Sequence, residues 1–250
     1  MRVHIWAENR PLEEAKAAMQ KIYPDGIEGA LASIFQDIEV CEISTSTSLD
    51  TDFGLSQSRL DEVDVLIYWS HKHWREIPDD VVDYLQKRVL EGMGIILLHS
   101  AHASKIFCRL LGTRTQTLRW RESDDSQRVW TVNPSHPICR GLAQESFVIP
   151  QDETYGEYFE IPNPDELLFL TVSSQQEVLR SGLCYHRGRG KIFYFSAGHE
   201  TYPVYYQREV RLIIKNAVFW ALNDTSYAYW PIWAREAEPL SDIQRRDEND

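Results

Sequence analysis

The sequence lacks several features that would assign it to a familiar class of protein. Its four cysteines, Cys41, Cys108, Cys139 and Cys184, include no pair spaced as C-x-x-C. This pattern excludes a disulfide framework and a structural zinc knuckle, and it is typical of reduced thiols. No apolar run approaches the ~18 residues that a membrane-spanning helix needs, and the apolar run near the start of the sequence is too short for a signal peptide. We therefore expect a cytoplasmic protein.

Basic residues are also scarce. Lys and Arg number 26 against 38 Asp and Glu, which gives a formal net charge of -12. Because nucleic acids and anionic membranes bind through basic surfaces, we expect neither as a partner, and a small neutral or cationic ligand is favoured. No Gly/Ser-rich or Pro-rich linker divides the chain. We expect one α/β domain over residues 1–236 and a charged C-terminal tail over residues 237–250.

Apolar periodicity predicts strands that alternate with helices in the first half of the chain. The expected strands are 2–7, 38–43, 63–69 and 94–98, and the expected helices are 11–22, 26–35, 78–91 and 104–111. Alternation of this kind builds a parallel sheet. The second half predicts an antiparallel extension, a polar and aromatic segment 151–157 at the end of a strand, a hairpin and a closing helix, 204–222.

Histidines gather where the strands are expected to end. Five of the eight do so: His71, His73, His99, His102 and His199. In open α/β sheets, ligands bind at the carboxyl ends of the strands. Histidines two residues apart on an extended segment point the same way, which suits chelation. Any one of them could instead be a buried hydrogen-bonding residue.

A metal site is one use for this concentration of imidazoles. A catalytic zinc ion needs three protein ligands and an open position. The candidate ligands are His71, His73, His102 and His199, with Glu153 or Glu200 as an oxygen donor. We therefore expect zinc or another divalent metal as a cofactor, although the spacing matches no standard zinc motif. Glu200 could alternatively orient a histidine or cap the next helix.

The segment Asp152–Glu157 combines carboxylates with an aromatic ring. This composition grips sugars through hydrogen bonds to hydroxyl groups and through stacking, although it is also found in solvated loops.

These segments resemble the ThuA family of trehalose-utilisation proteins. The resemblance is carried by DVLIYWSHKHW (64–74), LLHSA (97–101), SHPICRGL (135–142), DETYGE (152–157), YHRGRGKIFYF (185–195) and GHE (198–200). It implies a flavodoxin-like, three-layer α/β/α fold, similar to class I glutamine amidotransferases, with a mostly parallel sheet. It also implies a role in disaccharide catabolism, with a small-molecule carbohydrate as the partner. Trp74, Tyr155 and His186, which lie in these segments, are then expected to bind the ligand.

In those amidotransferases a cysteine occupies the turn after a strand, and a histidine and a glutamate follow a later strand. Here Ser100 falls near that turn and His199 at the position of the base, with no cysteine. The resemblance therefore does not imply glutaminase chemistry.

Three functional hypotheses follow. The first is a hydrolase or isomerase acting on a disaccharide or its keto derivative, with candidate catalytic residues His99, Ser100, His199, Glu200 and Glu153. The second is a non-catalytic sugar-binding or regulatory protein on a degenerate amidotransferase fold. The third is a Ser100 nucleophile with His199 as its base. Tryptophans such as Trp230 and Trp233 also suggest a homo-oligomer, although core packing explains them equally well.

Overall fold

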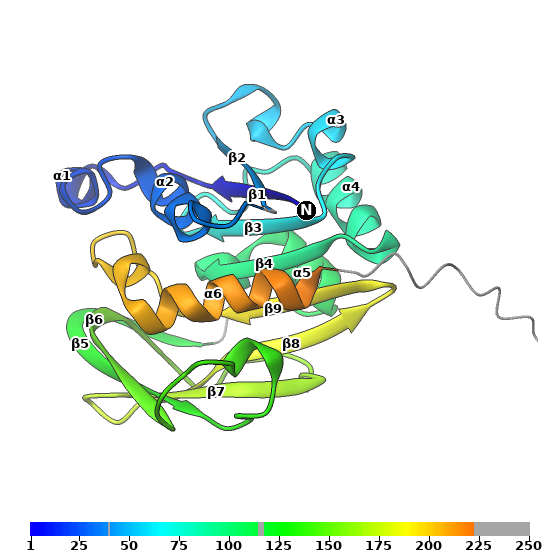
Figure 1. Ribbon diagram of the computed structural model, residues 1–250. Coiled ribbons are helices and arrows are strands. Elements are labelled where there is room, and N and C mark those ends of the chain that lie inside the picture. The colour runs from blue at the N-terminus through cyan, green and yellow to red at the C-terminus, as the bar shows by residue number, and fades with distance from the viewer. Residues whose placement is uncertain (40, 115–117, 223–250) are drawn as a thin grey trace, which may run out of the picture.

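A computed structural model describes residues 1–39, 41–114 and 118–222 of the chain (Figure 1). The expected charged tail and the two tryptophans before it lie outside the described residues. No helix among the described residues is long and apolar enough to cross a membrane.

The parallel half of the sheet contains β1 (Arg2–Ala7), β2 (Glu42–Thr47), β3 (Val65–Ser70), β4 (Gly94–His99) and β9 (Gly190–Phe195). They lie in the order β2-β1-β3-β4-β9 and all pair in parallel. This is the flavodoxin-like strand order, with the last strand of the motif supplied by β9. Every residue of β3 and β4 is buried, as expected for strands covered on both faces.

Helices cover both faces of these strands (Figure 1). On one face lie α1 (Glu13–Ile22), α2 (Gly26–Ala32) and α6 (Arg208–Ala221), which pack on alternate strand residues such as Ile67 and Ile96. On the other face lie α3 (Gln57–Leu60), α4 (Asp79–Glu91) and α5 (Lys105–Leu111), which pack on Leu66 and Leu97. The alternation of side chains along each strand thus supplies two apolar layers.

Short 3₁₀ turns complete the connections. They are η1 (Ser33–Phe35), η2 (Thr51–Gly54), η3 (Ser100–Ala103), η4 (Pro137–Cys139) and η5 (Val204–Tyr206).

The antiparallel extension continues the sheet from β9. It contains β8 (Val178–Arg187), β7 (Glu166–Ser173), β5 (Arg119–Thr131) and β6 (Ser146–Gly156), in that order. The second half of β5, from residue 127, pairs with both β7 and β6, whereas residues 119–125 pair with β6 alone. Irregularities in register around Asp125 separate the two halves. Such bulges bend and twist a strand pair. We call the strand pair beyond them, residues 119–125 and 152–156, the ribbon.

The fold class expected from the sequence is confirmed, but the bounds of one strand and of the closing helix were wrong. The strand expected at 38–43 lies at 42–47, because Ile38 donates a turn hydrogen bond to Phe35 and an edge strand of Ser and Thr follows it. The polar segment 151–157 lies at the end of β6, as expected. The closing helix begins at Arg208, since residues 204–206 form a 3₁₀ turn first.

Candidate functional site

Three histidines meet at the carboxyl edge of the parallel strands. His71 directly follows β3, His99 is the last residue of β4, and His199 lies in the turn after β9. The His71 ring centroid is 4.6 Å from that of His199 and 5.2 Å from that of His99, and the other pair is 5.4 Å apart. All three side chains are buried. Parallel pairing puts these strand ends at one edge and so brings together histidines that are distant in sequence.

Two carboxylates face the three imidazoles. Glu153, from the ribbon, places Oε2 3.2 Å from His99 Nε2 and 4.0 Å from His71 Nε2. The Glu200 carboxylate is 2.7 Å from His71 Nδ1 and 3.7 Å from His199 Nε2. Both carboxylates are buried, and burying charge is favourable only when it is paired. We call these five residues the histidine cluster.

Two ring nitrogens in the cluster lack hydrogen-bond partners. His71 Nε2 and His199 Nε2 are buried and make no hydrogen bond in the structure. His71 Nδ1 can donate to Glu200, so the lone pair of His71 Nε2 is left facing the cluster. His199 Nδ1 accepts from the Thr201 backbone N–H over 3.2 Å, so the proton of the neutral His199 ring is on Nε2, 3.4 Å from Glu122 Oε1. A carboxylate that fixes the tautomer of an imidazole is typical of metal sites. Ligand atoms of His71, His99, His199 and Glu200 lie within 4.8 Å of one another. The donor set therefore fits a zinc-like ion.

Burial and neighbouring charge shift the pKa values of the cluster residues in different directions. Burial, with the charge of His99, lowers the pKa of His199 to about 3, so that ring is neutral at neutral pH. Burial also acts to lower the pKa of His99, but the hydrogen bond and charge of Glu153 outweigh it and raise this pKa. The pKa of Glu153 falls to about 2, because its pairing with His99 outweighs its burial. The cluster thus holds a neutral imidazole beside an ion pair.

The turn after β4 is strained at His99. This residue has φ 55 and ψ -128. Residues other than glycine rarely adopt such a conformation. Hydrolases place a nucleophile on a strained strand-to-helix turn of this kind. Here the strained residue is an imidazole, and Ser100 follows it with its Oγ 2.5 Å from Tyr155 Oη. No hydrogen bond joins Ser100 to His199 among the described residues, so the geometry expected for a Ser100–His199 pair is not formed.

Tyr155 links this turn to the ribbon. Its hydroxyl donates to Glu153 Oε2 over 2.6 Å and lies 3.3 Å from His99 Nε2. Burial and the charge of Glu153 raise its pKa, so the phenol keeps its proton. A chain of hydrogen bonds therefore runs from Ser100 through Tyr155 and Glu153 to His99.

Two buried carboxylates that the sequence analysis did not assign hold the backbone of the cluster. Glu8, directly after β1, accepts hydrogen bonds from the backbone N–H groups of His71 and Lys72 over 3.0 and 2.9 Å. Asp152 accepts from the N–H groups of Gly198 and His199 over 2.9 and 3.0 Å. An acidic residue directly after an apolar strand was the available signal for Glu8.

Other predicted residues lie outside the histidine cluster. The chain turns after β3, so His73 points to Glu76, with its Nδ1 2.8 Å from that carboxylate. His186 is exposed on β8, 3.5 Å from Asp165. His102 is buried nearby, but its Nδ1 contacts the His99 carbonyl and Tyr194 Oη, and burial lowers its pKa to about 4. Of the four predicted metal ligands, the structure therefore brings together His71 and His199 but not His73 or His102.

A cavity of about 290 Å³ opens onto the cluster. His71, Glu153, Ser100, His102 and Tyr155 reach it from the sheet edge, and its outer walls are Lys72, Trp74, Arg75, Ala103, Leu118 and Trp120. Trp74 and Tyr155, two of the predicted ligand-binding residues, thus line the cavity, whereas His186 does not.

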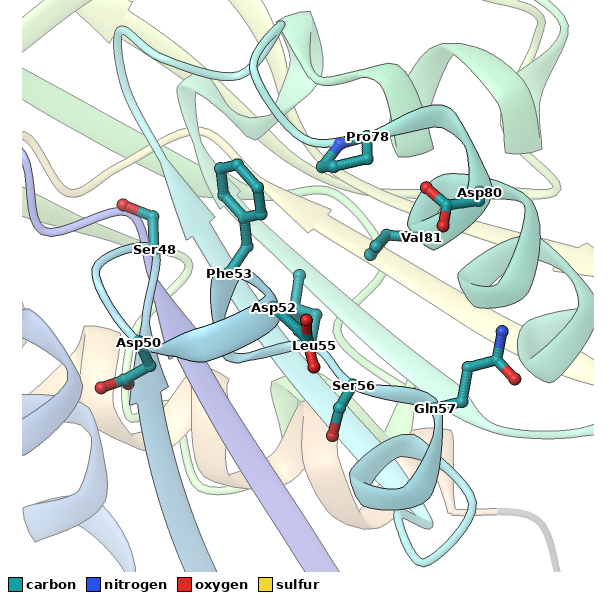
Figure 2. A pocket seen from close by; sticks show the side chains of 10 residues that line it. All are labelled: Ser48, Asp50, Asp52, Phe53, Leu55, Ser56, Gln57, Pro78, Asp80 and Val81. Atoms are coloured by element: carbon teal, nitrogen blue, oxygen red, sulfur yellow. The ribbon is translucent and has the colours of Figure 1, made fainter.

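A second cavity, of about 500 Å³, lies between loop 48–57 and the start of α4 (Figure 2). Figure 2 shows Phe53 and Pro78 on its walls with Asp50, Asp52 and Asp80 around it. None of the histidines lines it, so the larger cavity is not the one that adjoins the buried imidazoles.

Comparison with known proteins identifies the family of this chain. The model of the family ThuA, described as trehalose utilisation, matches residues 2–221. The chain belongs to the ThuA family. The family resemblance inferred from the sequence motifs is therefore confirmed. A search of curated proteins gives no match.

Several solved structures share the fold, and the first two described here are of ThuA-like proteins. One from Parabacteroides merdae has a TM-score of 0.65 at 12% identity, covering 89% of this chain and 90% of its own. One from Bacteroides uniformis has a TM-score of 0.61 at 18% identity, covering 89% and 91%. The cytoplasmic protein STM1381 from Salmonella typhimurium has a TM-score of 0.57 at 11% identity, covering 89% and 100%. At these identities the likeness shows the fold alone.

Proposed function

We propose that this ThuA-family protein is a metal-assisted enzyme of carbohydrate metabolism, a hydrolase or isomerase acting on a disaccharide or its keto derivative. The observation that carries the proposal is the pair of buried Nε2 atoms of His71 and His199, which have no hydrogen-bond partners and adjoin the carboxylates of the cluster. Leaving buried polar atoms unsatisfied is unfavourable, so their retention is best explained by a ligand. The family description, trehalose utilisation, supports a sugar as the substrate.

The metal would be held by His71 and His199, with Glu200 completing the set. A bound divalent ion supplies Lewis-acid polarisation of a sugar oxygen. Glu200 fixes the tautomer of His71 by accepting from Nδ1. The low pKa of His199 keeps its ring neutral at neutral pH, and a metal at Nε2 would take the place of the proton there.

Proton handling falls to the remaining residues. His99 holds a proton against Glu153, and Tyr155 donates to the same carboxylate oxygen. Since Glu153 and Tyr155 line the cavity, these hydrogen-bonded side chains can pass a proton between a bound sugar and the His99 imidazole. These roles agree with Glu153 and His99 as candidate catalytic residues.

The outer walls of the cavity suit a sugar ring. Trp74 and Trp120 lie there with Tyr155, and Trp120 keeps 64% of its surface exposed. Exposed aromatic faces next to polar groups are typical of carbohydrate recognition. We place this activity in the cytoplasm, since all four cysteines are free thiols.

Metal analysis of matched double variants tests the proposal. His71→Ala with His199→Ala removes both unpartnered nitrogens, whereas His73→Ala with His186→Ala removes two histidines outside the cluster. We expect stoichiometric metal in the wild type and in the second variant by plasma mass spectrometry. In the first variant we expect at least about a tenfold loss of zinc affinity by calorimetry.

Turnover of trehalose and its keto derivative should be lost with the metal. Equal metal content in the two double variants would contradict the proposed site. Saturable sugar binding with no product and no metal would instead support a non-catalytic sugar-binding or regulatory protein.

A further inference from the structure

We propose that the sugar bound in this cavity carries an anionic group, a phosphate or a carboxylate, which lies between Lys72 and Arg75. The inference rests on the proposed function, because it names the substrate class of the same cavity. It reverses the expectation from net charge, which favours a neutral or cationic ligand.

The local charge of the cavity differs from that of the whole chain. The formal net charge is -12, yet the lining holds two cations, Lys72 and Arg75, and one carboxylate, Glu153. That carboxylate is already paired with His99. A cleft with an excess of one sign attracts ligands of the opposite sign, even on a protein whose overall charge is unfavourable.

Two donors on the wall of the cavity have no acceptor. No acidic partner of the Arg75 guanidinium is found among the described residues, although acidic side chains outnumber basic ones. Trp74 Nε1 is buried and makes no hydrogen bond in the structure. A planar guanidinium presents paired N–H groups that match phosphate and carboxylate oxygens. These two neighbouring residues therefore supply donors that an oxygen-rich anion satisfies.

Lys72 is held in place by a contact that an incoming anion can replace. Its Nζ lies 3.6 Å from Glu122 Oε1 and 5.5 Å from the centre of the Trp120 ring. The Glu122 side chain is 41% exposed and also lies 3.4 Å from His199 Nε2, so it bridges the cation and the histidine cluster. A ligand anion at Lys72 would take over this ion pair, and the Trp120 ring lies beside it for the sugar.

The test compares sugars that differ mainly in charge. Binding of trehalose, trehalose 6-phosphate and a glucuronyl-glucose disaccharide is measured by calorimetry on the full chain, with inorganic phosphate as the sugar-free anion. We expect at least one of the anionic sugars to bind about tenfold more tightly than trehalose, as a charge-assisted hydrogen bond implies. The preference should shrink as salt is raised from about 50 to about 500 mM. Which anionic sugar binds more tightly identifies phosphate or carboxylate as the group.

Arg75→Gln should abolish this preference, because the anionic sugars lose more affinity than trehalose does. The matched control is Arg208→Gln, because Arg208 is 72% exposed in its side chain and lies outside the cavity. Equal affinity of the wild type for neutral and anionic sugars would overturn the proposal, as would an equal loss for both in Arg75→Gln. If inorganic phosphate binds as tightly as the sugar phosphate, the sugar contributes nothing to binding, and the proposal that the ligand is a sugar is overturned. Zinc loading is measured on the same samples, so a failed anion preference with intact metal binding leaves the proposed function standing.

Discussion

Replacing Glu8 by glutamine tests whether a residue outside the cavity positions the histidine cluster. Glu8 is 2% exposed and gives one carboxylate oxygen to the N–H group of His71 and the other to that of Lys72. Glutamine keeps the shape but offers one oxygen. Its amide NH₂ group would face a backbone N–H group, so one of the two donors would lose its acceptor.

The size of the effect follows from that lost bond. A hydrogen bond to a charged group contributes about 1.5–3 kcal/mol, and a buried donor without a partner carries a further desolvation penalty. We expect Glu8→Gln to lower the free energy of unfolding of the metal-free protein by about 2 kcal/mol. The freed backbone also lets His71 move from its place beside Glu200, so zinc affinity should fall about tenfold, as for other residues that support ligands.

Urea unfolding of the metal-free protein and zinc calorimetry on the folded protein measure the two effects separately. Glu62→Gln is the control, because the Glu62 side chain is 73% exposed. A surface substitution of this kind should change stability by less than about 0.5 kcal/mol. If Glu8→Gln destabilises the protein but leaves zinc affinity unchanged, Glu8 supports the fold only and the positioning role is refuted.

Two further predictions concern the framework. Arg121→Gln should lower stability at neutral pH by no more than about 1 kcal/mol. Hydrogen bonds from Arg121 and Ser173 lower the pKa of Glu177 from 4.5 to about 2. The contribution of Glu177 is fully present above the ordinary pKa and is lost as pH falls through the lowered one, so the difference in thermal unfolding between variant and wild type should narrow there. The pair of Arg121 with Asp125 persists at that pH, because the pKa of Asp125 is held lower still. Gly190→Ala places a Cβ against the Val89 carbonyl oxygen and should lower the free energy of unfolding by about 3 kcal/mol. Gly112→Ala, at a positive φ with open space around it, should cost only about 1 kcal/mol; equal losses would contradict this packing.

The central strands could be predicted because burial on both faces leaves a continuous apolar run, as in β3 and β4. The edge strand β2 could not, because its Ser and Thr residues resemble a loop, and the apolar Ile38 before it belongs to a turn. Strand edges carry little hydrophobic signal, so the pattern fails where the sheet meets solvent.

Predictions for the site were right for residues at strand ends and wrong for a residue beyond the strand. Histidines directly at strand ends, His71 and His99, were placed correctly because parallel pairing fixes where those ends meet. His73 was grouped with them on the assumption that the chain stays extended after β3, but a turn closed by a hydrogen bond from Glu76 to the His73 carbonyl directs it elsewhere. Side-chain alternation holds only inside a strand.

The position of Glu153 depends on a feature that no short sequence window encodes. In sheet order, β6 is at the far end from β4, yet Glu153 lies 3.2 Å from His99. The irregular register around Asp125 frees the ribbon from β7 and lets it reach the parallel edge. Without this ribbon the flavodoxin-like edge would supply three imidazoles and Glu200 but no carboxylate for His99. The antiparallel extension therefore completes the site, and the strained turn after β4 is used to aim an imidazole at that carboxylate.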